Sequence, residues 1–566
     1  MNYRLEIEKT DDFFRILPKG TFLSDYAQNP GGFTRFFHFD PGQVSEKIAS
    51  LQNQPFFHRE RLIEYLRDYH QSLGAPPETL RNIDDLNDPR ALVVMTGQQP
   101  GLLTGPMYTI YKTISCLWEA QRIEQTFDRR CIPVFWIASE DHNLEEAASI
   151  FWPDPEGSRS EGGGYSTLSI RPRRGHFKQP VGLLPLDPEG KKLSAFMQKL
   201  GTMLSLTTTI HSREVERIIQ SSLQDTLARS GTLGEWFSRL MLTFFGPCGL
   251  VLFEPDDARV KRLAGPLWEK TVADPLALPR IVDQAGQELE RCGYLRQLSS
   301  SSSSSSSSFS SDRCPFFLYE NRLYENQHRE GATPERVMWE YGAGKPGTSV
   351  RRTGGQGGTK TVGRGGTKTG GRGCTKTGGR GGTETGGQGG TETEGQGDGG
   401  GARKLVAGDR VAMDRMTRER VIWDGRLFHT QNQDYSPEQL QELLQLQPER
   451  ISPNVYLRPV FSEFLFPTLC YLAGPGEIGY FAQIKGVYEY FRLKMPIILP
   501  RFSATLRDAR KAGSGLLQDA YPQERKLNIF YLLNLYGPDF IKTIQSLKIE
   551  DYFVHYQIGI KAGTKA

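Results

Sequence analysis

TGQQPGLLTGPMYTIYK, residues Thr96–Lys112, is the stretch that decides the fold. It follows an apolar run, Ala91–Met95, that predicts a buried strand, and it leads through a Gly- and Gln-rich loop into a helix that Pro106 can start. Loop glycines let backbone N–H groups approach a ligand, and a helix N-terminus adds unpaired donors and a positive dipole. The stretch therefore predicts a site for an anion or a nucleotide, although it matches neither a Walker A loop nor a dinucleotide fingerprint.

A second strand and a second polar loop follow this helix. The helix is expected to run to about Phe127, and Cys131–Ala138 (CIPVFWIA) is apolar almost throughout, as in a strand covered on both faces. A strand–helix–strand unit of this length predicts a right-handed parallel crossover. The second strand ends in SEDHN, Ser139–Asn143, so two polar loops are expected at the carboxyl ends of neighbouring strands. Open α/β sheets bind ligands there.

The same order of elements returns near the C-terminus. Phe466–Leu472 predicts a strand, Gly474-Pro475-Gly476-Glu477 its loop, and the next residues a helix to about Phe491, followed by a strand at Ile497–Leu499. These units predict an α/β fold with a parallel sheet. Helices are also expected over Ala258–Val272 and in the tail.

Composition and pattern divide the chain into segments. We expect an α-rich N-terminal piece at 1–84, the first part of the core at 85–298 with an insertion near 152–232, a serine-rich tract at 299–312, a hairpin region at 313–342 turning at Glu320-Asn321, a glycine-rich octapeptide repeat at 343–404, the second part of the core at 405–510, and a helical tail at 511–566. The serine and glycine tracts cannot bury enough apolar surface to offset their ordering entropy, so both are expected to be disordered.

The net charge of +4 does not indicate a nucleic-acid partner. Residues 343–404 hold eleven Lys or Arg against four Asp or Glu, so the rest of the chain is mildly acidic. The seven cysteines form no CxxC pair, which argues against a zinc ribbon or a disulfide framework. No stretch is long and apolar enough to span a membrane, and the charged N-terminus does not look like a signal peptide, so we expect a cytoplasmic protein.

The opening loop supplies the first set of candidate ligand residues. Gly105, Tyr108 and Lys112 share one helix face, and side chains on a helix lean toward its N-terminus, so Lys112 can reach back toward an anion. The remaining loop candidates are Gly97, Gln98, Gln99 and Thr104. The plain alternative is a solvated lysine and a capping threonine.

Glu140, Asp141 and His142 form the densest titratable cluster in the chain, directly at a strand end. Two carboxylates and an imidazole suit general-base catalysis or a divalent metal. The alternative is a helix cap with a surface histidine. No second His or Cys stands at zinc-ligand spacing, so no metal site is assigned.

Other candidates carry weaker signals. Asn454 and Arg458 precede a buried segment, and an arginine there can pair with a carboxylate or phosphate or form a structural ion pair. Gly476, Glu477 and Tyr480 can line the same cleft, although a carboxylate at a helix start is favourable for dipole reasons alone. A basic flap over an acidic substrate is also conceivable at Arg171, Arg173, Arg174 and His176.

TGQQPGLLTGPMYTIYK followed by PVFWIASEDHN resembles the bacillithiol biosynthesis cysteine-adding enzyme family. The same family's C-terminal core is resembled by two further segments, SPNVYLRPVFSEFLFPTLCYLAGPGEIGYFAQIKGVYEYF and LLNLYGPDFI. The likeness therefore covers most of the chain outside the two low-complexity tracts. The resemblance implies a Rossmann-like core with connecting-peptide insertions. The family also carries a long coiled-coil arm used for dimerisation, and here only Phe502–Ala520 stands in its place, which puts a homodimer of that kind in doubt.

The resemblance implies a ligase that adds L-cysteine to glucosaminyl-malate. Amide formation in water needs activation, for which ATP with Mg²⁺ is the economical source, although no ATP motif is present. In this hypothesis Gly97–Thr104 and Lys112 bind an anionic group, Asp141 or His142 deprotonates the amine, and Arg458 holds a carboxylate. Two alternatives stay open: a non-catalytic nucleotide- or sugar-phosphate-binding protein, and a metal-dependent hydrolase built on Glu140, Asp141 and His142.

Overall fold

The computed structural model describes most of the chain in separate stretches. These are residues 3–10, 20–54, 56, 58–153, 165–170, 180–186, 191–206, 222–298, 313–320, 417–508, 529–530, 533 and 555–562. All of them belong to one compact unit formed by Met1–Gln327 and Lys404–Ala566, and His328–Arg403 make up a second unit that lies outside the described residues. The serine tract, the glycine repeat and the basic segment at Arg171–His176 also lie outside them.

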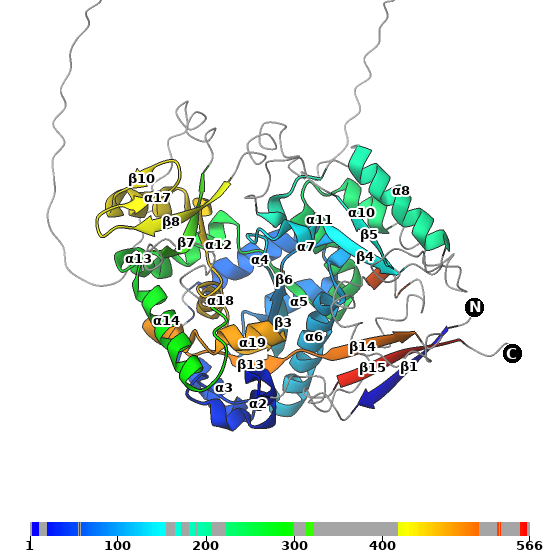
Figure 1. The fold of residues 1–566 in the computed structure, drawn as a ribbon, viewed down its shortest axis with the longest axis horizontal. Helices are drawn as coiled ribbons and strands as arrows, with labels where there is room; N and C mark the ends of the chain where they lie inside the picture. Colours follow the sequence, from blue (N-terminus) through cyan, green and yellow to red (C-terminus); the bar gives the residue numbers. More distant parts are fainter. Residues whose placement is uncertain are drawn as a thin grey trace, which may run out of the picture. The chain divides into compact units, whose positions relative to one another are not determined.

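A five-stranded parallel sheet forms the core of the larger unit (Figure 1). Its strands, in spatial order, are β13 (Ile497–Pro500), β12 (Thr468–Ala473), β2 (Leu92–Gln98), β3 (Cys131–Ile137) and β6 (Val251–Phe253). Every neighbouring pair is parallel, and the register places Met95 opposite both Val134 and Tyr471. The predicted α/β class with a parallel sheet is confirmed.

Helix α6 (Met107–Phe127) is the crossover between β2 and β3 and packs on both strands. Its inner face is apolar and includes Ile110 and Ile114, which are almost fully buried. Pro106 lies at its N-cap, where the missing N–H has no cost. The sheet order shows that β12 lies beside β2, so the loops after β12, β2, β3 and β6 share one edge of the sheet.

Among the described residues before the sheet, four α-helices make up the predicted α-rich N-terminal piece. They are α2 (Phe22–Gln28), α3 (Val44–Gln52), α4 (Arg59–Leu73) and α5 (Pro77–Asp85). A buried ion pair ties them to the second half of the core, because Lys47 Nζ donates to Glu463 Oε1 over 2.6 Å. The first described residues are an exception to the helical pattern, since Tyr3–Thr10 forms strand β1.

The segment between β3 and β7 holds a short hairpin and a series of helices. The hairpin pairs β4 (Ser149–Pro153) with β5 (Tyr165–Ser169). The helices are α7 (Leu144–Ala147), α8 (Lys191–Leu206), α10 (Gln224–Ala228), α11 (Leu233–Phe245), α12 (Ala258–Leu263), α13 (Gly265–Ala273) and α14 (Ala277–Arg291). The single helix predicted over Ala258–Val272 is wrong, because the chain breaks at Ala264 into α12 and α13.

A second sheet is antiparallel and includes strands from both sides of the low-complexity tracts. Its spatial order is β10 (Asp434–Tyr435), β9 (Phe428–His429), β8 (Thr417–Trp423), β7 (Arg313–Glu320) and β11 (Ile451–Pro453), and α17 (Pro437–Leu446) and α18 (Arg458–Leu465) follow β10 and β11 in the chain. The hairpin predicted to turn at Glu320-Asn321 needs a second strand after Asn321, and those residues lie outside the described stretches; β7 itself pairs with β8 on one edge and β11 on the other.

Two predictions near the C-terminus need correction. Gly474–Glu477 is not a loop: α19 (Pro475–Phe481) starts at Pro475, and a separate helix α20 (Lys485–Tyr490) follows. Pro475 can begin a helix, and the Glu477 carboxylate accepts the Gly474 N–H, which favours an immediate start. The tail also holds strands, since β14 (Ser503–Asp508) and β15 (His555–Ala562) form a sheet with β1.

The predicted tail helices over Tyr521–Ile544 lie almost entirely outside the described residues. Among the helices of the described stretches, none is long and apolar enough to cross a membrane.

Candidate functional site

The loop after β2 is buried and tightly packed. A Cβ on Gly97 would lie 2.8 Å from the Trp136 backbone oxygen, so only glycine fits beside β3. Leu103, Thr104 and Gly105 have φ values of 50°, 71° and 74°. Two consecutive non-glycine residues with positive φ are uncommon, and such strain gathers at functional sites.

Lys112 is held by three oxygen atoms. Its Nζ donates to Gly97 O over 2.7 Å and to Gln98 Oε1 over 3.0 Å, and it lies 2.5 Å from Glu477 Oε2. Burial lowers the pKa of Lys112, and the Glu477 charge opposes this effect. An ammonium group has three hydrogens, so these acceptors use all of them. Lys112 therefore joins the loop after β2 to the start of α19, and it has no donor left for a phosphate in this arrangement.

A hydrogen-bonded chain extends this contact to the loop after β3. Gln98 Nε2 donates to the Tyr108 hydroxyl over 3.4 Å, and that hydroxyl donates to Glu146 Oε1. The other Glu146 oxygen accepts from Asn143 Nδ2 over 3.0 Å. Three loops at one edge of the sheet are thus connected through side chains. Glu146 was not among the predicted site residues.

The remaining candidates on α19 surround the same edge. Glu477 also accepts from the Tyr471 hydroxyl over 3.3 Å, while Gly476 is exposed, and a Cβ there would touch nothing within 4 Å. Tyr480 is half-buried, stacks on Phe481, and interacts electrostatically with both Glu477 and Arg458. Tyr480 therefore lies between the Lys112–Glu477 pair and the acidic loop after β3.

The acidic loop and Arg458 meet, although they are far apart in the sequence. Arg458 Nε lies 2.8 Å from Glu140 Oε1, and its Nη1 lies 3.9 Å from Asp141 Oδ2. The Glu140 side chain is only 1% exposed, and burial raises its pKa. The Arg458–Glu140 contact has ion-pair distance without hydrogen-bond geometry, so both Glu140 oxygens and Arg458 Nε remain without hydrogen-bond partners. Buried groups of this kind are typical of a ligand site.

Asp141 and His142 form an adjacent acid–imidazole pair. The His142 backbone N–H donates to Asp141 Oδ1 over 2.7 Å, and His142 Nδ1 lies 3.5 Å from the same oxygen. Burial raises the pKa of Asp141, but the His142 hydrogen bonds and the Arg458 charge outweigh it and hold the pKa below its usual value. The His142 side chain is 57% exposed. His142 can therefore meet a substrate, while Asp141 stays ionised beside it.

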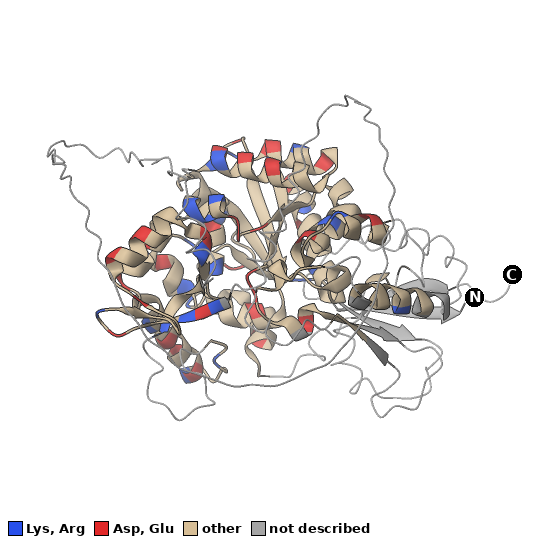
Figure 2. Cartoon of the chain, turned by 90° about the horizontal axis from the view of Figure 1, so that it is seen from above, with Lys and Arg blue, Asp and Glu red and all other residues tan. Residues whose placement is uncertain are grey.

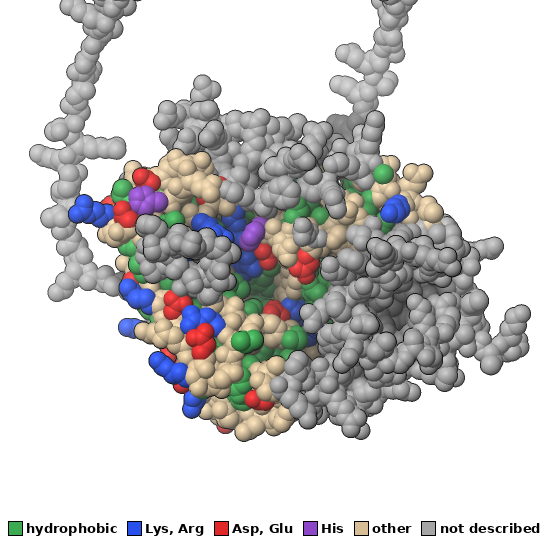
Figure 3. Space-filling view, viewed as in Figure 1, with side chains coloured by type: hydrophobic (Ala, Val, Ile, Leu, Met, Phe, Trp, Pro, Cys, Tyr) green, Lys and Arg blue, Asp and Glu red, His purple; other side chains and the backbone are tan. Residues whose placement is uncertain are grey.

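Further charged groups lie at the same edge and were not predicted as site residues. Glu254, directly after β6, accepts from the Ser139 hydroxyl, and burial followed by the charge on Asp256 raises its pKa to about 8. Lys261 pairs with Asp256. Glu254 could have been identified from the sequence, because it directly follows the apolar run Gly249–Phe253, and ligands bind at the carboxyl ends of such strands. Figure 2 marks the positions of acidic and basic residues along the ribbon, and Figure 3 shows acidic, basic and histidine side chains around a hollow in the surface.

Arg418, on β8 of the antiparallel sheet, contacts His142. Its Nη1 lies 3.2 Å from His142 Nδ1, and its Nη2 donates to Pro453 O over 3.2 Å. No sequence signal pointed to Arg418, because its place depends on how the second sheet packs on the first.

Three predicted residues have other environments. Asn454 Oδ1 accepts the backbone N–H groups of Tyr456 and Leu457 at 3.2 Å each, so it shapes the turn before α18. Thr104 is buried and donates to its neighbour's carbonyl. Gln99 is 6% exposed, and both of its amide atoms lack partners.

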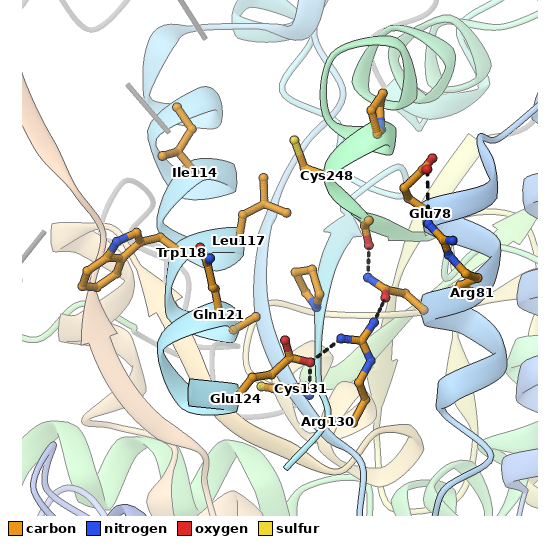
Figure 4. A pocket seen from close by; sticks show the side chains of 15 residues that line it. Glu78, Arg81, Ile114, Leu117, Trp118, Gln121, Glu124, Arg130, Cys131 and Cys248 are labelled. Atoms are coloured by element: carbon orange, nitrogen blue, oxygen red, sulfur yellow. Dashed lines mark hydrogen bonds and ion pairs between the residues drawn. The ribbon is translucent and has the colours of Figure 1, made fainter. Parts of the chain in front are cut away.

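A cavity of about 430 Å³ lies at the opposite, amino-terminal edge of the sheet (Figure 4). Trp118 and Leu117 of α6 line one wall, and Arg130 and Glu78 lie across from them. Its charged groups pair with one another, since Arg130 binds Glu124 and Asp85. Because its charges are already paired, this cavity is a weaker candidate for a ligand-binding site than the carboxyl edge of the sheet.

Within the described ranges, no group of three or more His, Cys, Asp or Glu side chains is placed to hold a metal ion.

The match to known proteins agrees with this arrangement. The family model described as "Bacillithiol biosynthesis BshC, N-terminal Rossmann-like domain" matches residues 11–321 and 411–502. The chain belongs to the BshC family. The match covers every strand of the parallel sheet, which is therefore Rossmann-like, and it passes over residues 322–410, where the glycine repeat lies.

Several members of the BshC family named "Putative cysteine ligase BshC" are similar to this chain over most of its length. The protein from Desulforamulus reducens is 27% identical over 89% of this chain and 71% of its own length. The one from Salinibacter ruber is 28% identical over 90% and 74%, and that from Halalkalibacterium halodurans is 26% identical over 87% and 70%. The predicted family is therefore confirmed. This family functions in bacillithiol biosynthesis.

Proposed function

We propose that this chain is a cysteine ligase that joins the carboxyl group of L-cysteine to the amine of glucosaminyl-malate, as the last step of bacillithiol synthesis. The observation that carries the proposal is the meeting of Glu140, Asp141 and His142 with Arg458 at the carboxyl edge of a Rossmann-like sheet. Membership in the BshC family and relatives named cysteine ligase support the reaction type.

His142 is the general base in this proposal. Amide formation requires an unprotonated amine, and His142 combines exposure with the negative charge of the nearby Asp141 carboxylate, which favours the protonated ring that forms when the base takes up a proton. Asp141 is the weaker base, because its lowered pKa reduces its affinity for a proton. Arg458 is the predicted carboxylate ligand, but Glu140 already faces it at 2.8 Å. Its role is to position Glu140 and Asp141.

ATP with Mg²⁺ is the proposed source of activation, and the loop after β2 is only partly suited to it. The start of α6 offers a helix N-terminus with the buried, unpartnered Thr109 hydroxyl. The three hydrogens of the Lys112 ammonium, however, already point to acceptors within the protein.

A single assay separates this function from the alternatives. The purified chain is incubated with L-cysteine and glucosaminyl-malate, with and without ATP, and all thiols are labelled and identified by mass. The ligase produces the cysteinyl amide only when ATP is present. Binding without turnover would indicate a non-catalytic module, and cleavage of glucosaminyl-malate would indicate a hydrolase.

A further inference from the structure

Arg418 is a buried arginine with no carboxylate in direct ion-pair contact, although the charges of Glu140 and Asp141 oppose the lowering of its pKa by burial. Only 7% of the residue is exposed, and its guanidinium lies 3.8 Å from the centre of the Phe317 ring. Its two hydrogen-bond partners are the His142 ring and the Pro453 carbonyl. Its Nε has no acceptor at all. Across the described stretches of the chain, no carboxylate lies within 4.0 Å of this side chain.

Two other cations described at this site each contact a carboxylate directly, whereas Arg418 does not. Arg458 faces Glu140, and Lys261 faces Asp256. A buried guanidinium gains most from a negative charge in direct contact, and the counter-charges of Arg418, Glu140 and Asp141, are not in ion-pair contact with it, so a ligand that enters the site can supply the contacting negative charge. A single cation of this kind can bind one negative charge. The planar guanidinium can donate two parallel hydrogen bonds, which matches the geometry of a carboxylate.

Two hydroxyl groups lie close to this position. Tyr319 on β7 and Ser452 on β11 are buried, their hydroxyls lie within reach of each other and of no other partner among the described residues, and Tyr319 interacts electrostatically with Arg418 and Glu140. Both can donate to the same anion. His142 marks the solvent side, because its half-exposed ring contacts Arg418 Nη1.

We propose that Arg418 binds a spectator carboxylate of the amine substrate, with Tyr319 and Ser452 as supporting donors. This inference rests on the proposed function, in which His142 receives the amine proton, and Arg418 lies beside His142. The ligand is not the reacting carboxyl of cysteine, because a charge-assisted bond would stabilise that group before activation. Arg418 is thus the residue that selects an amino sugar carrying an acidic substituent over a plain amino sugar.

Binding measurements without turnover test the inference first. L-malate and inorganic phosphate are titrated calorimetrically into the wild-type chain and into Arg418→Gln, Arg418→Lys and Arg420→Gln. Arg420 is the matched control, an exposed arginine on the same strand. We expect wild type and Arg420→Gln to bind L-malate more tightly than phosphate, Arg418→Gln to bind it at least tenfold more weakly, and Arg418→Lys to fall between them.

Equal L-malate affinity in wild type and Arg418→Gln would overturn the proposal, as would a wild type that binds no L-malate or prefers phosphate. If Arg418→Gln does not fold, Arg418→Lys serves as the test, because lysine keeps the positive charge but cannot donate two parallel hydrogen bonds to a carboxylate. Kinetics add a second readout: the KM for glucosaminyl-malate rises at least tenfold in Arg418→Gln, while the KM for cysteine is unchanged. If no variant makes amide but malate binding depends on Arg418, the carboxylate site stands and the proposed ligase function fails.

Discussion

Glu477 Oε2 lies 2.5 Å from Lys112 Nζ, so the first helical turn after β12 is tied to the crossover helix after β2. Lys112 is 3% exposed and Glu477 19%. Removing one partner of such a pair leaves a buried charge uncompensated. We expect Glu477→Gln to lower the free energy of unfolding by about 3 kcal/mol, at the low end for buried pairs because Glu477 is partly exposed. Urea denaturation measures the change.

Glu438→Gln is the matched control for this change. Glu438 also lies in the first turn of a helix, α17, but it is exposed. Its substitution should cost less than about 0.5 kcal/mol, as is usual for surface positions. Equal losses in the two variants would show that the Lys112–Glu477 pair has no special role.

Gly97 and Gly476 were both predicted to contact ligand, and they should respond differently to alanine. A Cβ at Gly97 would lie 2.8 Å from Trp136 atoms, whereas at Gly476 it would meet nothing within 4 Å. Gly97→Ala should destabilise the chain by about 1–3 kcal/mol through overpacking. Gly476→Ala, in the first turn of a helix, should be neutral or slightly stabilising. Thermal unfolding of both variants checks this, and a tolerated Gly97→Ala would contradict the close approach of β2 and β3.

Glu254 should make stability depend on pH. Burial raises its pKa from the ordinary 4.5 to about 8 in the folded state, so the folded chain binds a proton that the unfolded chain has already released. The contribution of Glu254 to stability is complete below pH 4.5 and is lost as the pH rises toward 8. Glu463, whose pKa burial raises to about 7, adds a slope of the same sign.

Urea midpoints of wild type and Glu254→Gln between pH 5 and 8 isolate the Glu254 contribution. The variant should lose less stability than wild type as the pH rises across this range. Parallel curves for the two proteins would mean that Glu254 titrates normally.

The base assignment predicts distinct losses of activity. Removing a general base typically lowers the rate by about 10²–10⁴-fold, which is the range expected for kcat of His142→Ala. Asp141→Asn should lower kcat less, since its carboxylate only supports the imidazole. His429→Ala is the control, because that histidine pairs with Asp424 and Asp434 in the antiparallel sheet. If Asp141→Asn and His142→Ala both worked at the wild-type rate, the assignment would be wrong.

The sheet was predictable from local pattern, and so were the loops at its carboxyl edge. The apolar runs Ala91–Met95 and Cys131–Ala138 predicted the strands now seen as β2 and β3, and the crossover rule made them parallel neighbours. Elements that depend on tertiary pairing were missed: β7 has the propensity for a hairpin, but strands from elsewhere in the chain occupy both of its edges. The start of α19 was missed because Gly474-Pro475-Gly476 reads as a turn until Glu477 is seen to cap it.

The residues of the candidate site were likewise only partly predictable from the sequence. Glu140 and Asp141 were identifiable from their position after a strand, and Arg458 as a cation, but their contact could not be read from positions more than 300 residues apart. The sequence also suggested that Lys112 faces a ligand, whereas the structure shows it facing Glu477. Arg418 follows the glycine repeat and carries no motif, so only the packing of the second sheet places it beside His142.

The central claim is that an amide forms between the cysteine carboxyl and the sugar amine. The most direct test supplies cysteine with both carboxyl oxygens as ¹⁸O, together with ¹⁵N-labelled glucosaminyl-malate and ATP, and measures the isotopes in the product and in the nucleotide or phosphate released. We predict one product that retains the ¹⁵N and one ¹⁸O, with the second ¹⁸O in AMP or phosphate. A chain that releases labelled amino sugar by cleavage, or forms no such product with all three compounds present, would contradict the ligase assignment.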